Sequence, residues 1–113
     1  MILVDECRWP HRGMLWCHMV SDHSIEELHA FADIIEVPRR GFQGDHYDLP
    51  EHVRHRAVLH GALEVGSREI VARLRRAGLR LAPRDRRRQS VAEIAIQHAT
   101  VASTGAAHVN HLA

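Results

Sequence analysis

The sequence predicts an α/β fold: a small mixed sheet of about three to four short strands with three helices, followed by a basic C-terminal tail. In residues 1–82, short apolar runs alternate with segments in which apolar residues recur at helical spacing. The 113 residues are 45% hydrophobic, which is enough for one packed core without disulfides or metal. We therefore expect one compact domain over residues 1–82 and a tail over residues 83–113.

Two apolar runs, residues 2–5 and 15–20, predict the first two strands, with a loop containing Pro10 and Gly13 between them. The eight residues from Glu6 to Gly13 are too few for a parallel crossover, so we expect an antiparallel pair. We expect this pairing to place Asp5 far from His18. Alternation along the second strand puts His18 on the face opposite Cys17.

The first helix has the clearest start signal. Ser24 and Glu27 have the spacing of a capping box, in which each side chain satisfies a backbone donor at the helix end. Pro38 is expected to end the segment. The apolar stripe of this helix consists of Ile25, Leu28, Phe31, Ala32 and Ile35.

Two further helices are expected after a loop at residues 38–45. Residues 46–49 predict a brief strand, and Asp48 or a neighbour would cap a helix over about residues 51–60. Residues 63–65 predict another strand, after which Ser67 would cap a third helix that Gly78 ends. This alternation of strands and helices predicts parallel βαβ units with right-handed crossovers.

The tail differs in charge from the rest of the chain. Residues 1–66 carry 11 acidic residues and 6 Arg, whereas residues 67–113 carry 3 acidic residues and 9 Arg. Ser90 and Glu93 form another capping box, which allows a short helix over residues 91–99 in an otherwise partly disordered tail. Nucleic-acid phosphates are the partner that the basic cluster would fit, through Arg84, Arg86, Arg87 and Arg88.

Several protein classes are excluded by the sequence. No apolar run approaches the roughly 18 residues that a membrane span requires, and the first residues lack the basic start of a secretion signal. With Cys7 and Cys17 as the only cysteines, we expect free thiols and a cytoplasmic location. Glycine-rich phosphate loops, nucleophile elbows and metalloprotease motifs are absent from the sequence.

A series of short motifs resembles a family of short bacterial and phage proteins catalogued as a domain of unknown function, over about residues 1–80. The family implies no activity. It implies that His18, Asp22, His46, Tyr47 and Asp48 belong to a family pattern, and that Ser often replaces Cys17, which argues against that thiol as a nucleophile. The motifs are residues 1–5, Trp9-Pro10, residues 15–18 with Ser21-Asp22, residues 26–32, and His46-Tyr47-Asp48.

The first functional hypothesis is a site for a small molecule or nucleotide, made by His18, His46 and Asp48. These residues would converge at the carboxyl ends of two parallel strands. Two imidazoles and a carboxylate can ligate a divalent metal or share proton transfer. Asp22 or Tyr47 would orient the imidazoles, and Asp5 would lie at the edge of the pocket.

Two alternatives stay open. In the structural alternative, His18 is a core histidine bonded to a backbone carbonyl, and Asp48 only caps the second helix; with 11 histidines in the chain, chance clustering is easy. In the functional alternative, the protein is a non-enzymatic accessory or regulatory binding module that uses its basic tail.

Overall fold

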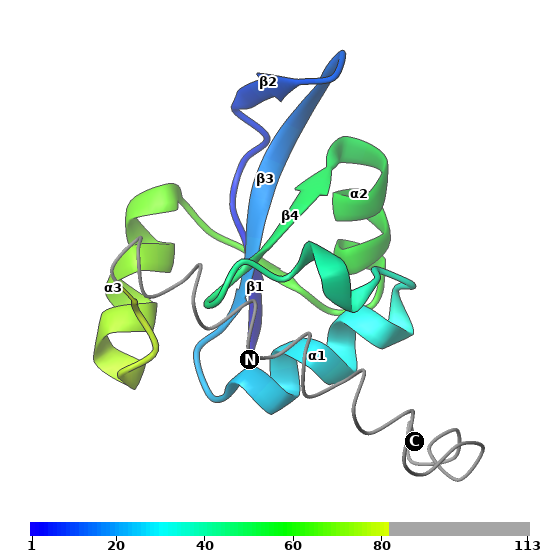
Figure 1. The fold of residues 1–113 in the computed structure, drawn as a ribbon. Coiled ribbons are helices and arrows are strands. Elements are labelled where there is room, and N and C mark those ends of the chain that lie inside the picture. Colours follow the sequence, from blue (N-terminus) through cyan, green and yellow to red (C-terminus); the bar gives the residue numbers. More distant parts are fainter. Residues whose placement is uncertain (82–113) are drawn as a thin grey trace, which may run out of the picture.

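The computed structural model describes residues 1–81, which form a mixed sheet between two layers of helices (Figure 1). Helices α1 (Ile25–Ile34) and α2 (Glu51–Leu59) cover one face of the sheet, and α3 (Ser67–Ala77) covers the other. The predicted α/β class and the three helices are confirmed. The predicted tail over residues 83–113, its helix over 91–99 and its arginine cluster lie outside the described residues.

Strand β3 (Met14–Ser21) is the centre of a five-stranded sheet. It pairs antiparallel with β1 (Ile2–Val4), β2 (Trp9–His11) and β4 (Tyr47–Pro50). Strand β5 (Leu63–Glu64) joins the far side of β1 and runs parallel to it. The predicted parallel arrangement therefore holds for β1 and β5, but it is wrong for the strands that carry His18 and Asp48.

Strand β2 is the strand that the sequence did not predict. Pro10 argued for a loop there, but a proline is compatible with a strand that has a free edge. Arg12 and Gly13 both have positive φ, 51° and 76°, as a two-residue hairpin turn of type I′ requires. The β2–β3 hairpin extends away from the rest of the domain in Figure 1.

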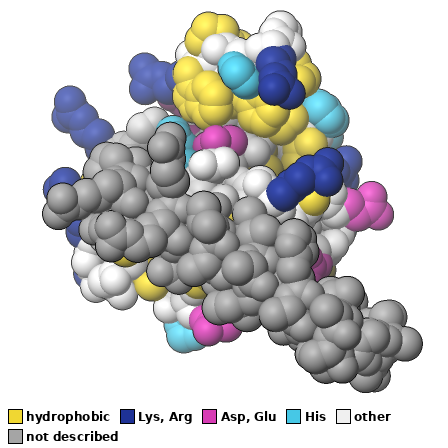
Figure 2. All heavy atoms as spheres, in the orientation of Figure 1, with side chains coloured by type: hydrophobic (Ala, Val, Ile, Leu, Met, Phe, Trp, Pro, Cys, Tyr) yellow, Lys and Arg dark blue, Asp and Glu magenta, His cyan; other side chains and the backbone are white. Residues whose placement is uncertain are grey.

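The hairpin carries large side chains that the main core does not bury. Trp9 and Trp16 stack on each other with ring centroids 5.8 Å apart, as expected for packing residues. Met14 and Leu15, near the turn, remain 38% and 40% exposed. Figure 2 shows hydrophobic side chains gathered at this end of the molecule with arginines beside them.

Alternation along β3 divides the interior into two cores. Cys17 and Met19 pack in the larger core under α1 and α2. Val20, one residue further, packs with Leu3, Ile70 and Leu74 under α3. His18 therefore lies on the side of β3 opposite Cys17, as the alternating pattern predicted, and this side faces α3.

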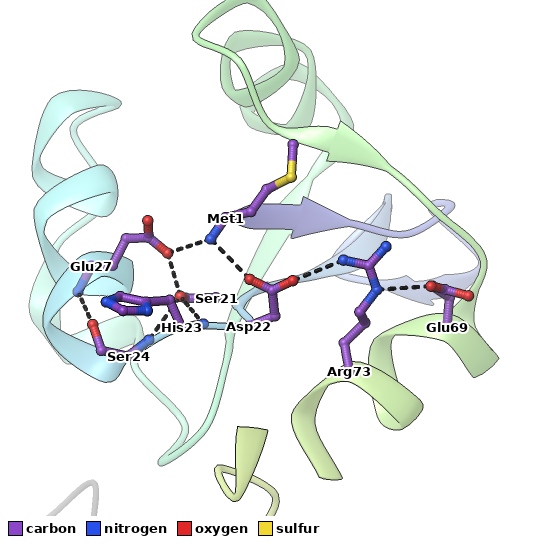
Figure 3. Close-up of polar contacts among 8 residues, drawn as sticks. All are labelled: Met1, Ser21, Asp22, His23, Ser24, Glu27, Glu69 and Arg73. Atoms are coloured by element: carbon purple, nitrogen blue, oxygen red, sulfur yellow. Dashed lines mark hydrogen bonds and ion pairs between the residues drawn. The ribbon is translucent and has the colours of Figure 1, made fainter. Parts of the chain in front are cut away.

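The predicted capping box of α1 is half correct. Ser24 accepts a hydrogen bond from the Glu27 amide at 3.0 Å, as expected. The Glu27 carboxylate does not return to Ser24; it binds the terminal amine of Met1 at 2.7 Å and the Ser21 hydroxyl (Figure 3). The Ser24 amide donates to Ser21 Oγ instead, so the end of β3 provides this part of the cap.

The caps predicted for the other two helices are wrong. Helix α2 starts directly at the end of β4, with Pro50 at its N-cap position and no side-chain cap from Asp48. Helix α3 has Gly66 at that position, and Ser67 is its first helical residue. Gly78 does end α3, in the left-handed conformation at φ 75°. None of the helices within residues 1–81 is long and apolar enough to cross a membrane.

Candidate metal centre

The register between β3 and β4 creates the site. His18 lies directly opposite Asp48 in this antiparallel pair, and His46 lies one residue before β4. The rings of His18 and His46 meet edge to face with centroids 5.1 Å apart. One ligand atom from each of His18, His46 and Asp48 lies within 4.8 Å of the other two. The three predicted residues therefore converge, although through antiparallel strands.

Asp5 holds His18 in place from the end of β1. Its Oδ1 accepts the backbone amide of His18 at 2.6 Å, and its Oδ2 lies 2.9 Å from His18 Nδ1. Burial raises the pKa of the Asp5 carboxyl. Hydrogen bonds from the His18 side chain and backbone lower this pKa by a larger amount, so the net pKa is below the ordinary value. An ionised carboxylate can only accept, so Nδ1 carries the proton and Nε2 is left for a ligand.

The expectation that Asp5 lies far from His18 is wrong. Because Val4, the last residue of β1, pairs with Met19, the following residue Asp5 comes beside His18. The distance depends on the register of the antiparallel pair, and the direction of the strands does not separate the two residues. Two other elements also hold Asp5: Ser67 Oγ donates to its Oδ2 at 3.1 Å, and Arg54 Nε donates to its carbonyl at 2.6 Å.

Asp45 holds His46 in the same manner. Its fully buried carboxylate lies 2.7 Å from His46 Nδ1, and its second oxygen accepts the Leu81 amide at 3.1 Å. His46 Nε2 lies 3.1 Å from Asp48 Oδ1. Burial lowers the pKa of His46, but Asp45 and Asp48 raise it more, so the net pKa is above the ordinary value.

Asp48 presents an oxygen without a hydrogen-bond donor. Its Oδ1 is shielded from solvent, and no donor in residues 1–81 is aligned to hydrogen-bond it. The 3.1 Å approach of His46 Nε2 is a charge contact, not a well-directed hydrogen bond. A carboxylate oxygen in this state is stabilised by a nearby cation.

A cavity of about 190 Å³ adjoins the two imidazoles. Asp5, His18, His46 and Ser67 form its polar end, and Arg80 also lines it. The remaining wall is apolar and comes from the face of α3 and from β3: Val20, Ile70, Val71 and Leu74. The metal-ligand cluster therefore lies beside a small, partly open cavity.

Two of the predicted site residues lie elsewhere. Asp22 pairs with the Met1 amine at 2.9 Å and with Arg73 at 2.8 Å, which connects the end of β3 to α3 (Figure 3). Tyr47 is buried on the other face of the sheet, where its hydroxyl lies 2.8 Å from His29 Nδ1. Asp5 and Asp45, not Asp22 and Tyr47, orient the imidazoles.

Three contributors were missed by sequence reasoning: Asp45, Ser67 and Arg80. The adjacent Asp45-His46 pair was the available signal, but its position after Gly44 suggested only a loop. Ser67 and Arg80 lie 49 or more positions from His18 along the chain, and only the packing of α3 brings them to the cavity.

A model of the family described as "protein of unknown function (DUF4031)" matches residues 2–77. The match runs from the first residue of β1 to the last residue of α3 and spans more than half of the chain. The predicted resemblance to a family of unknown function is thereby confirmed. Neither the curated proteins nor the solved structures contain a match.

Proposed function

Because the chain belongs to DUF4031, a family whose description gives no activity, we propose a function from the site itself: metal-assisted chemistry on a small molecule or nucleotide. The metal is a divalent ion held by Nε2 of His18, Nε2 of His46 and a carboxylate oxygen of Asp48. The observation that carries this proposal is that both imidazoles are oriented by buried carboxylates while their ligand atoms and that of Asp48 lie within 4.8 Å of one another.

The donor set has the chemistry of a catalytic zinc site. Such sites use three protein ligands of the imidazole and carboxylate types and keep a further position for water or substrate. Metal-bound histidines usually donate their other ring N–H to a carboxylate, which is the arrangement of Asp5 with His18 and of Asp45 with His46. A divalent ion would also neutralise the solvent-shielded oxygen of Asp48.

The role of the bound ion would be that of a Lewis acid. When bound, it would make a coordinated water more acidic and would polarise a carbonyl or phosphoryl oxygen of the substrate. The residues of this chain would hold the ion, fix both imidazole tautomers and shield the reacting group in the cavity beside α3.

The direct test is metal binding by the full-length chain after dialysis against chelator. We expect one Zn²⁺ or Co²⁺ per chain, and for Co²⁺ the visible absorption of a low-coordinate site. His18→Ala, His46→Ala and Asp48→Asn should each weaken binding at least about tenfold, because each removes one of three ligands. His52→Ala is the matched control, since His52 is an exposed histidine on α2 away from the cluster. Equal metal affinity in all four variants and the wild type would show that His18, His46 and Asp48 do not form a metal site.

A second candidate function follows from the basic surface of α3. Arg68, Arg75 and Arg76 are exposed on this helix, Arg80 follows it, and four more arginines occur at positions 84–88. These side chains would contact nucleic-acid phosphates in an accessory or regulatory module, and such binding weakens steeply as salt increases.

The nucleic-acid proposal is tested by a salt series with the full-length chain and duplex DNA or RNA. Replacing Arg84, Arg86, Arg87 and Arg88 together by Gln should reduce the slope of log affinity against log salt by about 0.9 for each lost phosphate contact on duplex DNA. An unchanged slope would remove these arginines from the proposal.

A further inference from the structure

We propose that the ligand of the His18, His46 and Asp48 site is a small carboxylate with a short apolar body, an inference that rests on the proposed metal-assisted function. The cavity beside the cluster combines an apolar wall, one arginine and a limited volume. Each of these three features selects for a different part of the ligand.

The apolar wall selects for a hydrocarbon body. Helix α3 presents Ser67, Ile70, Val71 and Leu74 to the cavity, at the spacing of one helical face. Val20 of β3 lies on the same side of its strand as His18 and adds to the wall. A ligand that reaches the imidazoles would therefore bury its body against aliphatic side chains. This contact is favourable when the body is apolar, because apolar surface is removed from water.

The volume limits the size of that body. A cavity of about 150 Å³ accommodates a benzene ring, so the 190 Å³ beside His18 accommodates a body of that size with one small polar group. A nucleotide with its base, sugar and phosphate is too large for this space. No Phe, Tyr or Trp is among the described residues that line the cavity, so it offers no aromatic side chain for a base to stack on. The size of the cavity therefore favours a small molecule over a nucleotide.

Arg80 selects for an anionic group. Its guanidinium lies 3.7 Å from Asp45 Oδ2, longer than a good hydrogen bond, and its side chain is 36% exposed. The planar guanidinium therefore has donors for a second acceptor, and its geometry matches a carboxylate. Arg80 lines the same cavity as His18 and His46, so the proposed ligand would contact the guanidinium and the metal position from one space.

Among anionic ligands, the surrounding charges favour one with a single negative charge over one with two. A divalent ion and Arg80 bring three positive charges, which Asp5, Asp45 and Asp48 already balance. Each added negative charge is therefore uncompensated in a partly buried site, where electrostatic energies are larger than in water. A carboxylate adds one such charge, whereas a phosphate monoester adds nearly two.

The test uses zinc-loaded, full-length protein and four probes: isovalerate, isoamyl alcohol, acetate and inorganic phosphate. Isovalerate and isoamyl alcohol share the branched body but differ in charge, whereas acetate keeps the charge and lacks the body. Dissociation constants come from NMR titration. We expect isovalerate to bind more tightly than the other three. Tighter binding of phosphate, or equal binding of isovalerate and isoamyl alcohol, would overturn the proposal.

Two variants localise the binding. Arg80→Gln should weaken isovalerate about tenfold or more, because it removes a charged hydrogen-bond donor, and should leave isoamyl alcohol unchanged. Val71→Phe should weaken both branched probes by filling the cavity. Arg76→Gln is the control, since Arg76 is exposed on the same helix. Thermal melting and zinc affinity verify that each variant is folded and retains its metal. Equal isovalerate binding in Arg80→Gln and the wild type would overturn the proposal.

Zinc titration without any probe separates this inference from the proposed function. If zinc binds and isovalerate does not, the ligand class is wrong and the metal site remains. If zinc does not bind, the metal-assisted function is wrong; the ligand class is then wrong as well unless metal-free protein binds isovalerate in an Arg80-dependent manner.

Discussion

Buried aspartates determine what the two site histidines can do. Asp5 and Asp45 each contact an Nδ1 atom, are almost completely buried, and are held by further donors from Ser67 and from the Leu81 backbone. Each carboxylate therefore favours a proton on Nδ1, which makes Nε2 the atom that would bind the proposed ion. This fixed tautomer distinguishes His18 and His46 from the exposed histidines of α2.

Replacing Asp5 by Asn should weaken zinc binding by about 10- to 100-fold, because the imidazole of His18 loses its charged orienting partner. A zinc competition titration measures the loss. Ser67→Ala, which removes a neutral donor from the same carboxylate, should have a smaller effect. A larger effect of Ser67→Ala than of Asp5→Asn would contradict the assignment of Asp5 as the residue that orients His18.

His29 is a different kind of histidine, buried on the opposite face of the sheet. Burial, together with the nearby positive charge of Arg39, lowers its pKa from 6.5 to about 4. Unfolded chains bind this proton below pH 6.5 and the folded protein does so only near pH 4, so stability should decrease as pH falls through this window. At pH 4, His29 should lower the free energy of unfolding by on the order of 2–3 kcal/mol relative to neutral pH.

The pH effect is measured by urea unfolding of the wild type and of His29→Asn at pH 7.5 and at pH 4.5. Asn keeps a hydrogen-bonding group for Tyr47 but does not titrate. The wild type should lose more free energy of unfolding between the two pH values than the variant does. Equal losses would show that His29 does not carry this pH dependence.

At the scale of elements, strands and helix ends were predictable to different degrees. The stripe of α1 and the αL glycine after α3 followed from local patterns and are confirmed. The predicted caps of α2 and α3 were wrong because Asp48 lies two residues before the N-cap position of α2, and Ser67 lies inside α3, where its hydroxyl donates to Asp5. Polar residues near a helix start were therefore the least informative part of the sequence.

Gly78→Ala should destabilise the domain by about 1 kcal/mol, because an L side chain is strained at φ 75°. The free energy of unfolding in urea measures this cost. Gly66→Ala provides the comparison: this glycine has φ −81° and open space around the position of a Cβ atom. A cost at position 66 equal to that at position 78 would argue against backbone strain as the cause.

At the scale of the whole molecule, the sequence predicted which residues gather at the candidate site better than it predicted how they meet. The identities of His18, His46 and Asp48 followed from residue type and motif. The pairing of β3 with β4 depends on long-range register, which no local pattern specifies, so the predicted strand direction was wrong. The same dependence on long-range contacts explains why the expected position of Asp5 was wrong and why Ser67 and Arg80 were missed.

A bound metal should stabilise the entire domain, since its ligands come from β3, from β4 and from the residue before β4. At free zinc 100-fold above the dissociation constant, linkage predicts a gain of about 2.7 kcal/mol in the free energy of unfolding. Calorimetry with and without zinc measures the shift in Tm. His18→Ala and His46→Ala should both abolish it, and a shift that persists in them would indicate binding elsewhere.

The cross-strand pairing of His18 with Asp48 links the chemistry to the accuracy of folding. If β4 slipped by one position along β3 so that Tyr47 came opposite His18, Asp48 would come opposite Cys17 and turn toward the aliphatic interior, while the phenol would turn toward His18. A molecule misaligned in this way would lose the proposed ion-binding site and its larger core together. Metal uptake would therefore report, in a single measurement, which fraction of a preparation has reached the native alignment.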